Sequence, residues 1–265
     1  MIVDLLRQSY TLVFLRAAAP GAPLDRVSAA CAASARHPDG RWRWRVEGDE
    51  RVATTTDAAA LAARSPIALT TGGDAPLTLT WHRDLLRQPA EDVLRIHVPR
   101  QAAVPLTELL VDVAAAYGAQ MSWLTTFDLS LLVGESMRRA QLASTPEDMR
   151  EFLPPPPDLL ALVDTSIVER FAALAPSGQI DRLRLPEAVH WADAWPTDLV
   201  ARVGRRRVDG APWHQRRTEG DLVLLVAADE PPERERPRAL AAVADCIDAI
   251  ALPALQHARR AEGDS

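Results

Sequence analysis

The chain has 265 residues, of which 48% are hydrophobic and 25% are charged, as in an ordinary globular protein. Its 30 basic residues are all arginine and stand against 36 acidic residues, for a formal net charge of −6. This composition excludes a collagen-like protein, a coiled coil, a wholly disordered chain and a disulfide scaffold. The acidic balance also argues against a general nucleic-acid binder.

The first 90 residues predict several short strands and few helices. The apolar run 10–15 is typical of a strand, and the alanine-rich segment 25–35 is typical of a helix. Arginine alternates with large apolar residues over 41–46, which predicts a half-buried strand with Trp42, Trp44 and Val46 on its buried face. A short helix is expected over 57–63, and a hairpin that joins 67–71 to 77–81 through Gly72-Gly73-Asp74.

The clearest pattern is strand, helix, strand between residues 93 and 127. A strand is expected at 93–98 and another at 121–127. Between them, apolar residues recur at the spacing of one helix face, with Gly118 in place for a C-terminal cap: Leu106, Leu109, Leu110, Val113 and Tyr117. Asp128 is then expected to cap a helix over 129–143.

Four consecutive prolines at 154–157 must be extended and mark the best candidate boundary in the chain. Neither side carries a complete-looking fold of its own. We therefore interpret residues 1–265 as one domain, with a subdivision into 1–153 and 158–265 as the alternative.

The C-terminal part predicts alternating strands and helices. Residues 188–195 are expected to be extended, 199–203 to form a short helix that ends at Gly204, and 205–217 to form a basic loop. A buried strand is expected at 221–227, and an amphipathic helix with Leu240, Val243, Ile247 and Ile250 on one face. Together the elements predict an α+β fold with a mixed, largely antiparallel sheet packed with amphipathic helices.

The two cysteines and the lack of a long apolar segment indicate the cellular compartment of the protein. Cys31 and Cys246 lie far apart among small or apolar residues, and we interpret them as reduced, buried thiols, although the sequence leaves a disulfide open. No run of 18 apolar residues and no signal-peptide pattern is present, so a cytoplasmic protein without membrane contact is expected.

A search for catalytic motifs finds none of the common ones. The absence of lysine excludes a P-loop or Schiff-base lysine, and GxGxxG, HExxH and CxxC are absent. Gly134-Glu135-Ser136 approaches a nucleophile elbow but falls inside an expected helix. His190, near Asp193, is a conceivable general base, although a structural imidazole is the preferred interpretation. We expect no cofactor, no metal and no enzymatic turnover.

Aromatic and charged residues suggest two patches for a protein partner. Trp213 stands in an arginine-rich stretch with Arg216 and Arg217, a combination typical of binding anchors. Asp229 and Glu230, followed by the acids of 233–235, would suit a basic partner surface. The sequence does not choose between the two patches. Trp191 is expected to be structural, as are Trp81, Trp123 and Trp195.

The order of elements in the C-terminal part resembles a bacterial family. A strand with tryptophan (189–195, VHWADAW), a short helix that ends near Gly204, a hydrophilic stretch and the apolar strand 222–227 are similar to the immunity-protein family numbered 52 of polymorphic toxin systems and to related uncharacterised proteins of GC-rich bacteria. The likeness covers roughly residues 90–250, and the family's tryptophan corresponds to Trp191. The N-terminal 90 residues and the arginines of 205–217 depart from it.

The resemblance implies a cytoplasmic α+β protein that binds and neutralises a toxin, often a nuclease, encoded by an adjacent gene. We therefore expect an immunity protein whose partner is that cognate toxin, with no nucleic acid bound. Two alternatives stay open: an accessory or structural protein of a secretion system or phage, and an enzyme with an unrecognised site. The neighbouring gene would discriminate among the three.

Overall fold

The computed structural model describes residues 7–19, 24–35, 45–46, 67–71, 76–85, 89–144, 165–174 and 183–252. The chain divides into two compact units, which are described one at a time. The first unit comprises 1–124, 193–196 and 218–224, and the second comprises 125–192, 197–217 and 225–265. The predicted proline boundary at 154–157 lies outside the described residues and stays a prediction.

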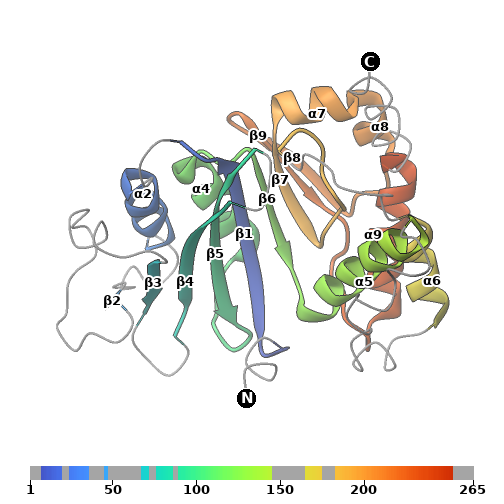
Figure 1. Ribbon diagram of the computed structural model, residues 1–265, viewed down its shortest axis with the longest axis horizontal. Coiled ribbons are helices and arrows are strands. Elements are labelled where there is room, and N and C mark those ends of the chain that lie inside the picture. Colours follow the sequence, from blue (N-terminus) through green and yellow to red (C-terminus); the bar gives the residue numbers. More distant parts are fainter. Residues whose placement is uncertain are drawn as a thin grey trace. The chain divides into compact units, whose positions relative to one another are not determined.

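A nine-stranded sheet in the described part of the chain confirms the predicted α+β class, and every strand has residues in the first unit. The strand order is β2-β3-β4-β5-β1-β6-β7-β9-β8, and the pairs from β2 to β1 are antiparallel (Figure 1). The strands are β1 (Ser9–Ala17), β2 (Arg45–Val46), β3 (Ile67–Thr70), β4 (Thr78–Asp84), β5 (Glu91–Pro99), β6 (Met121–Thr125), β7 (Ala192–Pro196), β8 (Gln215–Glu219) and β9 (Leu222–Val226).

The apolar strands β1 and β5 form the core of the first unit. Leu12 pairs with Ile96 and Phe14 with Leu94, and all four side chains are fully buried. The predicted pairing of β3 with β4 is confirmed, and Trp81 is buried on β4. Burial of such large apolar side chains is the main term that stabilises the sheet.

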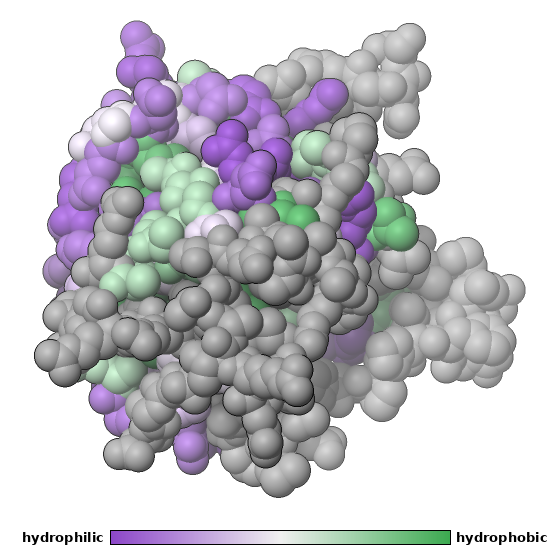
Figure 2. All heavy atoms as spheres, turned by 90° about the vertical axis from the view of Figure 1, so that its left-hand side faces the viewer, coloured by the Kyte–Doolittle hydropathy of each residue, from purple (hydrophilic) through white to green (hydrophobic). Residues whose placement is uncertain are grey.

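Two helices complete the first unit. The helix α2 (Leu24–Ser34) packs against α4 (Leu106–Tyr117), as the alanine-rich and amphipathic patterns predict. Leu109, Leu110, Val113 and Tyr117 are buried, whereas Asp112 is exposed. Gly118 ends α4 with φ of 67°, a left-handed conformation that favours glycine. On the face seen in Figure 2, hydrophilic residues border smaller areas of hydrophobic ones.

A row of charged residues crosses three strands of the first unit. Asp92 on β5 lies opposite Arg16 on β1 and opposite Arg83 on β4. The Asp92 side chain is fully buried, and the Arg83 guanidinium donates to both of its carboxylate oxygens, at 2.8 and 3.3 Å. The carboxylate in turn raises the pKa of Arg83. The Arg16 guanidinium lies 5.8 Å from the centre of the Tyr117 ring, a cation–π distance.

Five described helices belong to the second unit: α5 (Phe127–Ser144), α6 (Thr165–Ala173), α7 (Thr197–Val203), α8 (Arg205–Gly210) and α9 (Pro237–Ala249). Helix α6 packs against α5 and α9, and α8 packs against α7 and α9 (Figure 1). Leu240, Val243, Ile247 and Ile250 are buried, which confirms the predicted face of α9. No described helix is long and apolar enough to cross a membrane.

The start of α5 differs from the prediction. The strand β6 ends at Thr125, and Phe127 already begins the helix. Thr126, not Asp128, is the N-cap, because its hydroxyl oxygen accepts the Leu129 N–H at 3.2 Å. In the sequence, Thr126 and Phe127 fit the pattern of the preceding strand as well as they fit the start of a helix. Only the hydrogen bond from the Leu129 N–H to the Thr126 hydroxyl locates the change from strand to helix.

The predicted loop at 205–217 is wrong, because this stretch contains α8 and β8. Both elements are polar and lack the periodic apolar residues from which a helix or strand is predicted. In α8, Val208 alone is buried. The next strand, β9, is buried along its whole length, as predicted, and Gly220, with φ of 56°, occupies the two-residue turn before it.

The structure also describes both cysteines and several of the tryptophans. Cys31 and Cys246 are buried and no disulfide joins them, and burial raises the pKa of the Cys31 thiol to about 12. Trp195 is fully buried, whereas Trp123 and Trp191 are only half-buried. The predictions for Trp42, Trp44, the helix at 57–63 and the turn at 72–74 lie outside the described residues.

Candidate functional site

In the part of the second unit that the structure describes, five arginines gather on α8 and the start of β8. We call Arg205, Arg206, Arg207, Arg216 and Arg217 the arginine surface. Residues 205–217 contain these five arginines and one aspartate, a formal charge of +4 in a chain of net charge −6. Arg205, Arg206, Arg207 and Arg216 are exposed, and Arg217 is half-buried.

Local structure holds the arginine surface in place. Gly204 separates α7 from α8 with φ of 106°, a conformation that strongly favours glycine. Its carbonyl accepts the Val208 N–H at 3.1 Å, and Val208 anchors α8 by its buried side chain. After α8, the Trp213 indole N–H donates to the Val208 carbonyl at 2.7 Å. Trp213 therefore connects the end of α8 to the approach to β8.

Trp213 is held by a hydrogen bond within the protein. The side chain is half-buried, and its only polar group is bonded inside the protein. Sequence reasoning placed Trp213 among the partner-binding residues because it stands beside arginines. The hydrogen bond to Val208 fixes it at the end of α8, and its contact with a partner stays a prediction.

One arginine of the surface forms an ion pair with an acid on α8. Arg216 pairs with Asp209 at 2.6 Å, and both side chains are about half exposed, so the pair adds little stability. In the part of the chain that the structure describes, no ion pair involves Arg205, Arg206 or Arg207. Their positive charge is therefore available to a partner.

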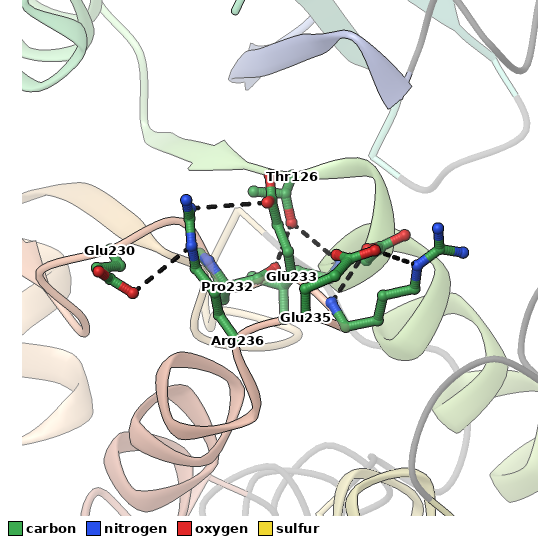
Figure 3. A network of polar contacts seen from close by, with 9 residues as sticks. Thr126, Glu230, Pro232, Glu233, Glu235 and Arg236 are labelled. Atoms are coloured by element: carbon green, nitrogen blue, oxygen red, sulfur yellow. Dashed lines mark hydrogen bonds and ion pairs between the residues drawn. The ribbon is translucent and has the colours of Figure 1, made fainter.

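The second predicted patch, around Asp229 and Glu230, is largely neutralised by its own arginines. Both residues are exposed, but Arg236 lies 3.5 Å from Glu230 and 3.6 Å from Glu233 (Figure 3). Arg234 pairs with Glu235. Glu233 is buried, which corrects the expectation that the acids of 233–235 face a partner together.

The loop that carries these acids is tied to the start of α5. The Thr126 hydroxyl donates to the Pro232 carbonyl at 2.6 Å, and the Arg234 backbone N–H donates to Asp128 at 3.1 Å (Figure 3). Asp128 thus serves the loop and not the helix for which it was predicted as a cap. These bonds stabilise the fold, and Asp229 stays exposed beside the loop.

Among the weaker catalytic candidates, Ser136 and Glu135 are engaged in structural contacts and His190 is buried. The Ser136 hydroxyl donates to the Leu132 carbonyl at 2.6 Å within α5. Glu135 is buried and accepts hydrogen bonds from Arg138 and Arg139, and Arg138 chiefly lowers its pKa. His190 is buried, and the Trp191 indole N–H donates to the Ala228 carbonyl at 3.0 Å. Among the described residues, no group of three or more His, Cys, Asp or Glu could hold a metal.

The sequence indicated that Arg205, Arg206 and Arg207, with Arg216 and Arg217, could hold an anion or an acidic partner, but it did not single out the first three as the centre of the site. The signal that would have identified them is the ratio of arginine to acid over 205–217, which is far higher than over 229–238. Burial and pairing then separate the two patches.

Comparisons with known proteins give little further detail. No family model matches the chain, and no curated protein matches it. Among solved structures, the chain is similar to one described as Pseudomonas aeruginosa T6SS protein PA0821, with 17% sequence identity and a TM-score of 0.45, over 91% of this chain and 72% of that one.

Proposed function

We propose that this protein is an immunity protein, which binds and neutralises a toxin encoded by an adjacent gene through protein–protein contact and without turnover of its own. The arginine surface is the observation that supports the proposal most directly. Exposed arginines on a short, tightly connected frame are typical of binding anchors, because the guanidinium makes several hydrogen bonds at little conformational cost.

A protein partner suits this charge distribution better than a nucleic acid does. The chain as a whole is acidic, so a long polyanion is repelled away from the arginine surface. A folded partner can present a local acidic patch to the arginines alone. Opposite charges would then accelerate association and fix the orientation of the complex.

The resemblance of residues 90–250 to the immunity-protein family numbered 52 favours the same function. In that interpretation the half-buried Trp191 is a structural residue, with its indole N–H bonded to the Ala228 carbonyl. The arginine surface lies where the chain departs from the family pattern. It would therefore carry the specificity for this protein's own partner.

Co-expression with the adjacent gene tests the proposal. The neighbour's product should slow growth when expressed alone, and growth should recover when this chain is co-expressed. The two proteins should also co-purify in a fixed ratio. A neighbour that is harmless by itself and does not co-purify would contradict the immunity function.

A further inference from the structure

We infer that α8 inserts into a carboxylate-lined cleft of the partner protein, so that Arg205, Arg206 and Arg207 are engaged together. This inference rests on the proposed function and adds the shape and the chemistry of the partner's binding site. It follows from the order of residues on one short helix, and not from the number of arginines alone.

Helical geometry spreads the three arginines around α8. Successive residues of an α-helix are separated by about 100°, so three consecutive side chains cover about 200° of its circumference. Val208, the next residue, points into the protein, whereas all three arginines are exposed. The three side chains therefore leave the α8 backbone in different directions, on the sides that Val208 does not occupy.

A flat partner surface cannot contact all three of these arginine side chains. A plane that touches one side of a helix reaches side chains on the same face, which are three or four residues apart. Consecutive residues do not share a face, so a plane would engage at most two of the arginines. The walls and floor of a cleft can engage all three.

The charges indicate carboxylates as the lining of that cleft. A guanidinium and a carboxylate match in a planar, bidentate geometry. Asp209 on α8 pairs with Arg216, and Asp198 on α7 pairs with Arg202, so neither acid neutralises the three arginines. The positive charge of the three arginines is therefore left for carboxylates of the partner.

The frame around α8 reduces the loss of conformational freedom on binding. Gly204 sets the direction of the helix, Val208 anchors it, and the Trp213 indole holds its last turn. A binding element that is already ordered loses less entropy in a complex than a flexible loop does.

Single charge reversals distinguish a cleft from a flat surface. Affinity for the purified product of the adjacent gene would be measured by calorimetry for the wild-type chain and for Arg205→Glu, Arg206→Glu and Arg207→Glu. Each of the three variants should bind at least about tenfold more weakly, because each reversal places two carboxylates in opposition. Arg238→Glu, the same charge change at an exposed position on α9, should bind within about twofold of wild type.

The possible outcomes separate the inference from the proposed function. Full affinity in one of the three α8 variants would indicate a flat contact, and full affinity in all three would exclude α8. In both cases the immunity function would stand and the cleft would be refuted. If the wild-type chain does not bind the neighbour's product, both fail together. Binding of duplex DNA that the α8 reversals abolish, with partner affinity unchanged, would also refute the cleft. Unchanged melting temperatures would confirm that the variants fold.

Discussion

The buried ion pair between Asp92 and Arg83 allows a quantitative test of the first unit. Asp92→Asn keeps the size of the side chain and removes its charge. The carboxylate is fully buried and accepts two hydrogen bonds, whereas the Arg83 side chain is 25% exposed. Loss of one partner from a fully buried pair costs about 3–5 kcal/mol. Because water can reach Arg83 in part, we expect a smaller destabilisation, of about 2–3 kcal/mol.

Urea unfolding followed by tryptophan fluorescence measures this change in the free energy of unfolding. The variants are Asp92→Asn, Arg83→Met and the double replacement, with Asp221→Asn, at an exposed position in the turn between β8 and β9, as the matched control. The coupling energy of the double-mutant cycle should be about 1–3 kcal/mol, and the control should change stability by less than about 0.5 kcal/mol. A change below about 0.5 kcal/mol for Asp92→Asn, equal to the control, would refute the reasoning that this buried charge depends on Arg83.

Three further changes probe the second unit. The pKa of Glu135 is lower in the folded protein than the unfolded-state value of about 4.3. The ionised carboxylate therefore stabilises the fold fully above that value, and this stabilisation is lost as the pH falls through the folded-state pKa. In urea titrations, Glu135→Gln should therefore make the free energy of unfolding fall less steeply at acid pH. Gly204→Ala should destabilise the protein by about 1–2 kcal/mol, because φ at Gly204 is 106°. The control Gly134→Ala lies within α5 and has open space around the added Cβ, so it should stabilise the protein by about 0.5–1 kcal/mol. Thermal melts that rank the two variants the other way would contradict this expectation. Thr126→Ala removes both the N-cap bond and the bond to Pro232, for about 1–2 kcal/mol, and Thr126→Ser should restore most of it.

Elements with a strong local pattern were predictable from the sequence. The helix faces of α4 and α9 follow from apolar spacing, and the β3–β4 hairpin follows from two β-rich runs around glycines. In these segments the residues that face the core recur with the period of the helix or strand. The periodic pattern therefore carries the structure without knowledge of distant contacts.

Elements that are stable only through packing were not predictable. Helix α8 has one buried side chain, and β8 is polar along its length, so neither has a period to detect. Their order comes from the buried Val208, from Gly204 and from the packing of α8 on α7 and α9. The start of α5 likewise depends on one hydroxyl, that of Thr126.

The sequence by itself determined the α+β class, the acidic net charge and the concentration of arginine at 205–217, because each is a sum or a period over neighbouring residues. Only the tertiary structure decided which charges are neutralised. Asp92 meets Arg16 and Arg83 through strand pairing, Glu233 is buried beside Arg236, and Arg205–Arg207 stay exposed. Charge compensation depends on distances of a few ångströms between residues far apart in the chain, and those distances exist only after folding.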